Sequence, residues 1–145
     1  MRAIHPQSLG MKLMKSVLLV DDDNAVLMAI GVRLKQMGYT VFTAKDAVNA
    51  VSAVRQNNPD VVVLDISLPA GDGFLVADRL QNLVASAATP VIFITASENP
   101  KLRQKAAKYG AAAFLLKPFD ATTLADAIET ALSSGSRWQP RASGE

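Results

Sequence analysis

Five short apolar runs recur along the chain, and each is bounded by polar or turn-forming residues. They cover residues 17–20, 40–44, 61–64, 91–95 and 113–116. Three of the runs are apolar almost throughout instead of alternating with polar residues, which is typical of parallel strands buried on both faces. The pattern therefore predicts five strands that belong to one buried sheet.

Amphipathic segments with recognisable ends separate these runs. Helices are predicted to begin near residues 24, 46, 73, 100 and 120. Asp46 and Asn99 are favourable N-caps. Gly38 and Gly110 stand where a helix would stop. The apolar spacing predicts that the later helices bury the following side chains: Val48, Val51, Val54, Phe74, Leu75, Leu80, Leu124, Ile128 and Leu132.

The alternation of strand and helix predicts a parallel sheet with helices on both faces. Five such units predict an α/β fold, the flavodoxin-like doubly wound (βα)5 sheet with strand order 2-1-3-4-5. The 145 residues are the usual size of one domain and are too few for a (β/α)8 barrel. We expect a flexible N-terminal extension over residues 1–14, the domain over residues 15–134 and a polar tail over residues 135–145.

The amino-acid composition excludes several classes of site and of protein. The absence of cysteine excludes disulfides, thiolate metal sites and cysteine nucleophiles. The formal charge is only +2, the basic residues 101–108 are interpreted as a solvated helix face, and no direct nucleic-acid contact is expected. No stretch approaches the roughly 18 apolar residues of a membrane span. The apolar run after Lys15 is too short, and too acidic at its end, for a secretory signal. We expect a soluble cytoplasmic protein with no membrane contact.

Polar residues follow or end four of the predicted strands. Asp21 and Asp22 follow the first strand, and Asp65 follows the third. Thr95 ends the fourth strand, and Lys117 follows the fifth. The carboxyl ends of parallel strands share one edge of the sheet, and doubly wound folds bind their ligands there. We therefore expect these five side chains to converge on one site.

Three carboxylates in one cleft repel one another and need positive charge nearby when they are partly desolvated. The alternative role of a helix cap suits Asp23, at the start of the first helix. For Asp21, Asp22 and Asp65 together, a Mg²⁺ ion held by oxygens at roughly 2.1 Å would supply the charge. Lys117 would supply a second, mobile cation. Such a set is suited to phosphoryl chemistry, with a carboxylate nucleophile that forms an acyl phosphate.

Four motifs, in order and placed at strand ends, resemble the response-regulator receiver family of two-component systems. They are Val17-Leu18-Leu19-Val20-Asp21-Asp22-Asp23, Leu64-Asp65-Ile66-Ser67-Leu68-Pro69-Ala70-Gly71-Asp72-Gly73, Pro90-Val91-Ile92-Phe93-Ile94-Thr95-Ala96 and Lys117-Pro118-Phe119. The resemblance covers about residues 15 to 134. The family commonly has Met where Leu68 stands, a change that conserves volume.

By this resemblance, Asp65 is the phosphoacceptor of a Mg²⁺-dependent reaction. Asp21, Asp22 and Asp65 would hold the metal together with the backbone carbonyl of Ser67. The expected phosphodonor is a sensor histidine kinase or a histidine phosphotransfer protein that docks beside the first helix. Such a domain catalyses its own phosphorylation and dephosphorylation and is not an enzyme in the usual sense.

The same resemblance implies a switch. Thr95 would be the hydroxyl that contacts the phosphoryl group, and Lys117 would pair first with Asp65 and then with the phosphate. Phe114 matches the family's switch aromatic and would turn inward into space left by Thr95. Pro118 stands where the family often has a cis peptide. The surface of the fourth helix, fifth strand and fifth helix would then bind a downstream protein target, and dimer formation on activation is left open.

Three other functions are compatible with parts of the pattern. A phosphate-independent receiver-like interaction module usually lacks the acceptor, the acid pair or the lysine, and all of them are present here. A Mg²⁺-dependent phosphohydrolase would need a second acid close to its aspartyl nucleophile, whereas Asp72 stands too far along the loop. A flavodoxin-type redox protein would need a phosphate-binding loop after the first strand, where three aspartates would repel a phosphate. The sequence therefore predicts a receiver.

Overall fold

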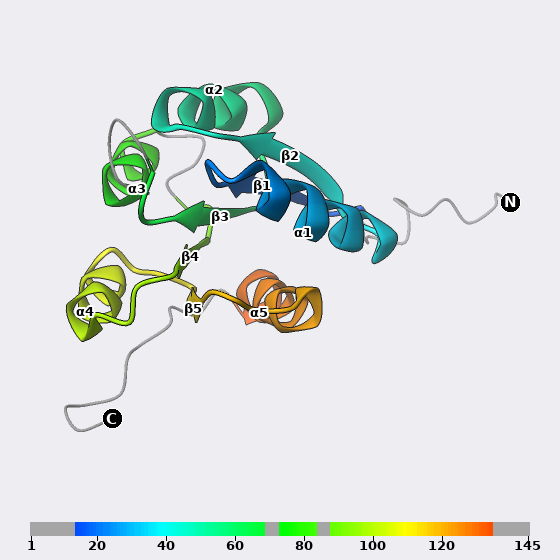
Figure 1. Cartoon of the computed structure of the whole chain (residues 1–145). Coiled ribbons are helices and arrows are strands. Elements are labelled where there is room, and N and C mark those ends of the chain that lie inside the picture. Colours follow the sequence, from blue (N-terminus) through cyan, green and yellow to red (C-terminus); the bar gives the residue numbers. More distant parts are fainter. Residues whose placement is uncertain (1–13, 69–72, 84–87, 135–145) are drawn as a thin grey trace, which may run out of the picture.

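The computed structural model describes residues 14–68, 73–83 and 88–134. It confirms the predicted sheet of five parallel strands in the order β2-β1-β3-β4-β5 (Figure 1). The strands are β1 (Ser16–Val20), β2 (Thr40–Ala44), β3 (Val61–Asp65), β4 (Val91–Thr95) and β5 (Ala113–Leu116). The helices are α1 (Asn24–Gln36), α2 (Ala47–Asn57), α3 (Gly73–Gln81), α4 (Pro100–Lys108) and α5 (Ala121–Ser134). The predicted extension up to residue 13, the predicted tail and residues 69–72 of the third-strand motif lie outside the described residues.

The centre of the sheet is buried because its strands carry apolar side chains on both faces. Every residue of β3 is buried, as are residues 17–20 of β1 and residues 92–95 of β4. The two outer strands, β2 and β5, are only partly buried. The carboxyl ends of β1, β3 and β4 therefore emerge together from an apolar interior.

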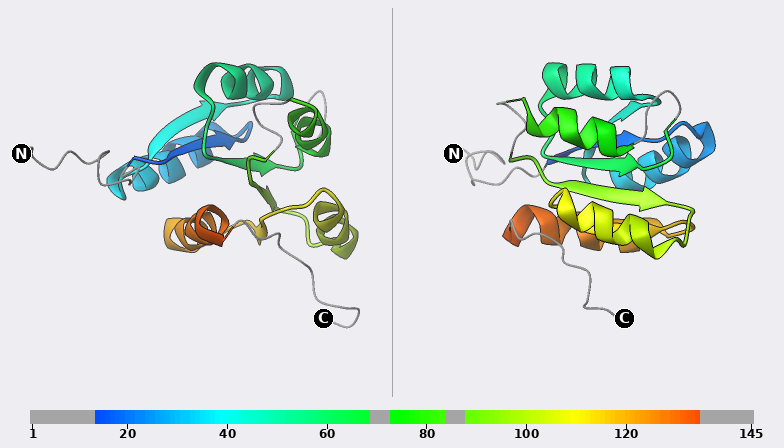
Figure 2. Two further views of the ribbon diagram at one scale, coloured as in Figure 1. Left: turned by 180° about the vertical axis from the view of Figure 1, so that it is seen from behind. Right: turned by 90° about the vertical axis from the view of Figure 1, so that its left-hand side faces the viewer.

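Helices cover both faces of the sheet (Figures 1 and 2). On one face, α2, α3 and α4 pack against strand residues such as Leu18, Leu64 and Phe93. On the other face, α1 and α5 pack against residues such as Val63 and Ile94. Burial of apolar surface contributes roughly 25 cal/mol per Å², so the two layers hold the strand ends in fixed positions.

The helix ends follow the predicted capping residues. Asp23 and Asp46 cap α1 and α2, and each side chain accepts a backbone N–H of the first turn at 2.9 and 2.8 Å. After α1, Gly38 has a φ of 103°, a backbone conformation that favours glycine. The Lys117–Pro118 peptide bond is cis, as the resemblance implied.

Two predicted core positions are wrong. Val48 of α2 is 72% exposed, and Leu75 of α3 is 40% exposed. The buried stripe of α2 consists instead of Ala47, Ala50 and Val54. Val48 is one residue, or about 100° around the helix, from Ala47 and so faces solvent. Helical spacing alone could not choose between the two stripes, because the small alanines that let α2 approach the sheet carry a weaker apolar signal than the valines.

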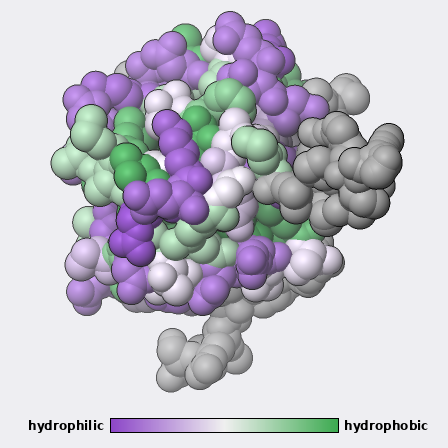
Figure 3. All heavy atoms as spheres, turned by 90° about the vertical axis from the view of Figure 1, so that its right-hand side faces the viewer, coloured by the Kyte–Doolittle hydropathy of each residue, from purple (hydrophilic) through white to green (hydrophobic). Residues whose placement is uncertain are grey.

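On the face that Figure 3 draws, hydrophilic residues surround smaller groups of hydrophobic ones. Among the residues that the structure describes, no helix is long and apolar enough to cross a membrane. Two large hydrophobic side chains, Met28 and Val32, are exposed on α1. Because residues four apart share one face of a helix, they form an apolar strip there.

Candidate functional site

The candidate site lies at the carboxyl ends of β1, β3, β4 and β5. Parallel pairing aligns the ends of β1 and β3, so Asp21 and Asp65 leave adjacent strands side by side. The neighbouring strand β4 ends on Thr95, whose carbonyl accepts the backbone N–H of Lys117 at 2.8 Å. The sheet itself therefore brings the predicted residues to one edge.

The three predicted carboxylates converge. Asp21, Asp22 and Asp65 each offer an oxygen, and these oxygens lie within 4.8 Å of one another. Asp21 is fully buried and Asp65 is 4% exposed, whereas Asp22 is open to solvent. Burial raises the pKa of Asp21; contact with Lys117 offsets part of this rise, and the charge of Asp65 adds to it. The cluster therefore concentrates negative charge that needs compensation.

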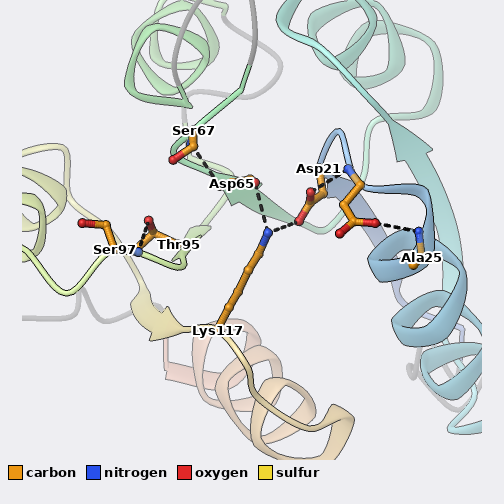
Figure 4. A network of polar contacts seen from close by, with 8 residues as sticks. Asp21, Ala25, Asp65, Ser67, Thr95, Ser97 and Lys117 are labelled. Atoms are coloured by element: carbon orange, nitrogen blue, oxygen red, sulfur yellow. Dashed lines mark hydrogen bonds and ion pairs between the residues drawn. The ribbon is translucent and has the colours of Figure 1, made fainter.

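Lys117 supplies a cation to this cluster (Figure 4). Its Nζ lies 2.7 Å from Oδ2 of Asp21 and 3.1 Å from Oδ2 of Asp65. Burial alone would lower the pKa of Lys117, but the two carboxylates outweigh burial and raise that pKa above its ordinary value. The ammonium therefore stays charged and links the ends of β1 and β3 from the end of β5.

Local hydrogen bonds orient both buried carboxylates. Oδ1 of Asp21 accepts the backbone N–H of Asp23 at 2.9 Å, and Oδ1 of Asp65 accepts that of Ser67 at 3.0 Å. The second oxygen of each carboxylate, Oδ2, is the one that contacts Lys117. Ser67 contacts Asp65 through its N–H, so the ligand role of its carbonyl stays a prediction.

The donor set fits a hard divalent cation. All three acids offer carboxylate oxygens, which Mg²⁺ prefers together with water. In the described part of the chain, the buried Oδ2 of Asp21 accepts no hydrogen bond. Lys117 meets it as an ion pair at 2.7 Å without the alignment of a hydrogen bond. Because this oxygen is buried and charged, a metal ion bound to it would add to the charge compensation that Lys117 supplies.

Thr95 lies on the other side of Asp65 from Asp21 (Figure 4). It is fully buried, and its Oγ1 accepts the backbone N–H of Ser97 at 3.1 Å. That bond uses a lone pair of the hydroxyl and leaves its proton available for donation. Since no hydrogen bond joins Thr95 to Asp65 among the described residues, the switch role of Thr95 stays a prediction.

Phe114 is already buried, with 7% of its surface exposed. It belongs to the core on the side of α2, α3 and α4, and the guanidinium of Arg103 lies 5.0 Å from its ring centroid. Such a cation is attracted to the face of an aromatic ring. An inward turn of Phe114 therefore does not start from an exposed position in this structure. Arg103 was not identifiable from the sequence, where its basic segment predicted only a solvated face.

Gly73 lets the start of α3 approach the end of β3. A Cβ atom at this position would meet the carbonyl oxygen of Asp65 and, at 2.9 Å, the Cα of Ile66. The N–H of Gly73 donates to the carbonyl of Ile66 at 2.8 Å, which holds the two segments together. Gly73 was part of a recognised motif, but only the folded chain shows which atoms it approaches.

Gly73→Ala is expected to destabilise the protein, although alanine normally favours a helix over glycine by about 1 kcal/mol. The added methyl group would press on backbone atoms of Asp65 and Ile66, which cannot rotate away. We expect the free energy of unfolding, measured in urea, to fall by about 1–3 kcal/mol. Gly31→Ala is the matched control, because a Cβ there would meet only a side-chain atom of Val41 at 3.8 Å. Equal stability of the two variants would contradict the steric argument.

The fold and the acidic site define a signalling domain of the two-component type, and comparison with known proteins agrees. The family model described as the response regulator receiver domain matches residues 17–129. The chain belongs to this family, whose members accept phosphoryl groups and transmit signals instead of turning over substrates.

Individual relatives are similar over most of this chain. PilH of Pseudomonas aeruginosa is 31% identical over 83% of this chain and 99% of its own length. RpaA of Synechocystis sp., a DNA-binding dual master transcriptional regulator, is 35% identical over 74% of this chain and 44% of its own length. The chain spans only about half the length of several curated relatives.

Solved structures show the same fold. The chemotaxis response regulator CheY4 of Vibrio cholerae has a TM-score of 0.75 and 28% identity, covering 80% of this chain and 97% of that one. The non-phosphorylated HemR receiver domain of Leptospira biflexa has a TM-score of 0.74 and 32% identity, covering 88% of this chain and 98% of that one. The predicted α/β fold and family are therefore confirmed.

Proposed function

We propose that this chain accepts one phosphoryl group on Asp65 from a phosphohistidine and signals through the surface of α4, β5 and α5. The observation that carries the proposal is a buried carboxylate paired with a cation: Nζ of Lys117 lies 3.1 Å from Oδ2 of Asp65. A carboxylate next to a lysine and two further acids is suited to forming an acyl phosphate and to balancing its charge.

In the proposed transfer, a carboxylate oxygen of Asp65 attacks the phosphorus of the donor. A new O–P bond forms, and the P–N bond of the phosphohistidine breaks and returns its electron pair to the imidazole nitrogen. Lys117 is placed to balance negative charge on the transferring oxygens. Thr95 would then donate its hydroxyl proton to one of these oxygens.

Asp21, Asp22 and Asp65 would hold Mg²⁺, with the carbonyl of Ser67 as a further ligand. When bound, the ion would supply positive charge against the phosphoryl oxygens and help to orient them. The chain contributes three carboxylates whose oxygens lie within 4.8 Å of one another. The buried Oδ2 of Asp21 meets Lys117 as an ion pair at 2.7 Å but accepts no aligned hydrogen bond in the described residues, which supports the metal assignment.

The proposed output is a change of charge partners. After phosphorylation, Lys117 would turn from Asp21 toward the phosphoryl oxygens, and Thr95 would move toward them as well. Phe114 would follow the movement of Thr95 and carry Arg103 with it, because the ring and the guanidinium are in contact. A local charge event of this kind biases an element with two arrangements. The altered α4 surface would then bind a downstream protein.

The phosphodonor, a histidine kinase or a histidine phosphotransfer protein, would dock beside α1. Ala25, Met28, Ala29 and Val32 are exposed on this helix, and their spacing places them on one face. The strip starts shortly after the acid pair at the end of β1. A partner helix seated on it would therefore hold its phosphohistidine close to Asp65.

Intact mass after incubation with acetyl phosphate tests this function, because a small phosphodonor needs no docking partner. We expect the gain of one phosphoryl group in the presence of Mg²⁺ and none when the metal is chelated. If no gain occurs, a Mg²⁺ titration followed by thermal unfolding separates two explanations. Stabilisation by Mg²⁺ would indicate a strict need for a kinase, and its absence would favour a phosphate-independent interaction module.

Asp22→Ala is expected to weaken Mg²⁺ binding roughly tenfold and to reduce phosphorylation together with it, because one negative ligand is lost. Asp22 is exposed, so the fold should tolerate the change. Calorimetric titration with Mg²⁺ measures the effect, and Asp126→Ala at an exposed position of α5 is the control. An unchanged dissociation constant for Asp22→Ala would remove this residue from the metal site.

A further inference from the structure

Strand β2 is an outer strand of the sheet, and no strand of the described part of the chain lies on its far side (Figure 1). Its residues, Thr40–Ala44, include no charged residue and no proline. Natural edge strands often carry such residues because they prevent pairing with another chain. The outer edge of β2 can therefore form backbone hydrogen bonds with a strand of another chain.

The direction of each backbone group of β2 follows from its pairing with β1. The N–H of Thr40 and the carbonyl of Ala44 both bond on the β1 side, at 2.9 and 3.1 Å. In a parallel ladder, alternate residues turn both of their backbone groups toward the same neighbour. Phe42 therefore also faces β1. Val41 and Thr43 turn their N–H and C=O groups outward.

A groove of about 670 Å³ runs along this outer edge, between β2 and α2. The strand lines it with residues 41–44, followed by Lys45, and the helix contributes polar, uncharged side chains that include Asn49, Ser52 and Gln56. The groove thus combines unpaired backbone groups with walls that are uncharged apart from Lys45. These properties suit an added β-strand.

We propose that β2 pairs with β2 of a second copy of this chain, antiparallel and about a twofold axis, so that the two sheets become continuous. The outward backbone groups set the register. Val41 of each copy lies opposite Thr43 of the other, and each such pair exchanges two N–H to C=O hydrogen bonds. Phe42 then lies opposite Phe42 of the second copy, beside the axis.

Self-complementarity favours a second copy over an unrelated extended segment. A twofold axis places each residue near its own counterpart, so any charge close to the axis would meet a like charge. β2 contains none, and Lys45, the one charged residue among those that line the groove, lies beyond the end of the strand. Phe42 is half-buried in the monomer and would gain an aromatic partner across the axis.

The proposed interface is separate from phosphoryl transfer. It uses the lateral edge of the sheet, whereas the acidic site lies at the carboxyl ends of the strands. Both can therefore operate in one molecule. Asp65→Asn should form the same dimer as the native chain, so a failure of either proposal can be recognised without the other.

Sedimentation velocity over a concentration series tests the dimer. We expect the native chain to dimerise and Thr43→Lys to raise the dissociation constant about tenfold or more, because two like charges are added near the axis. Thr122→Lys, the same change at an exposed position of α5, is the control and should leave it unchanged. A native chain that stays monomeric at every concentration, or a dimer insensitive to Thr43→Lys, would overturn the proposal.

Phe42→Cys tests the register, since the chain contains no other cysteine. Opposite residues of a non-hydrogen-bonded antiparallel pair have Cα atoms about 4.5 Å apart, within reach of a disulfide. Mild oxidation should therefore link Phe42→Cys into a covalent dimer. Val48→Cys, which is exposed on α2, should stay monomeric. Absence of the covalent dimer for Phe42→Cys would overturn the register.

Discussion

Asp65→Asn is expected to abolish phosphoryl incorporation from acetyl phosphate and to leave the fold intact. The amide keeps nearly the same shape, and its oxygen can still accept the N–H of Ser67, which the native carboxylate accepts at 3.0 Å. It lacks the anionic oxygen that the nucleophilic attack requires. Lys117 keeps its 2.7 Å contact with Asp21. The change removes the contact of Lys117 with Oδ2 of Asp65, but it also removes a negative charge that opposes ionisation of Asp21, so only a small change in stability is expected.

Intact mass spectrometry measures this outcome, and thermal unfolding checks that the variant is folded. Asp78→Asn is the matched control, because it makes the same chemical change at an exposed position of α3. The control should incorporate one phosphoryl group as the native chain does. If Asp65→Asn incorporated a phosphoryl group at the native level, another residue would be the acceptor and the proposed function would be wrong.

Lys117→Met is expected to lower stability in the absence of metal and to tighten Mg²⁺ binding. The ammonium is the cation that lies between the buried carboxylates of Asp21 and Asp65, at 2.7 and 3.1 Å. Removing it leaves these charges facing each other, which should cost about 2 kcal/mol after allowing for the partly exposed lysine. Because the ammonium occupies oxygens that a metal ion would use, its loss should lower the Mg²⁺ dissociation constant roughly tenfold.

Urea unfolding with and without Mg²⁺ measures both effects. Saturating Mg²⁺ should restore much of the lost stability, because a ligand that binds only the folded state stabilises it. Lys101→Met, at an exposed position of α4, is the control and should behave as the native chain. The phosphorylated Lys117→Met variant should also fail to shift the amide resonances of α4. Unchanged stability, metal affinity and switching would remove Lys117 from the mechanism.

Much of this architecture could be predicted because it depends on local pattern. The apolar runs located β2, β4 and β5 at their observed bounds, and five alternating strand–helix units led to the flavodoxin-like strand order that the sheet has. Parallel strands align their carboxyl ends at one edge of the sheet. Asp21, Asp65 and Lys117 each stand at the end of a predicted strand, so they could be assigned to that edge before any contact between them was known. The buried strands could be recognised in the sequence because both of their faces are apolar.

Other features depended on packing. Val48 is exposed, although its spacing is as regular as that of the buried stripe of α2. The contact of Arg103 with Phe114 joins a helix and a strand that are brought together only by the core. The approach of Gly73 to the backbone of Asp65 has the same origin. A periodic pattern shows that a helix has an apolar face, but the rotation of that helix is set by the surface it meets.

The sequence by itself determined the order of the strands, the residue types at their ends and the membership of the receiver family. Only the tertiary structure decided how these residues meet: the two contacts of Lys117, the burial of Asp21 and the outward backbone groups of Val41 and Thr43. The reason is physical. Strand and helix formation depends on neighbours along the chain, whereas charges and hydrogen-bonding groups far apart in sequence acquire partners only when the layers pack.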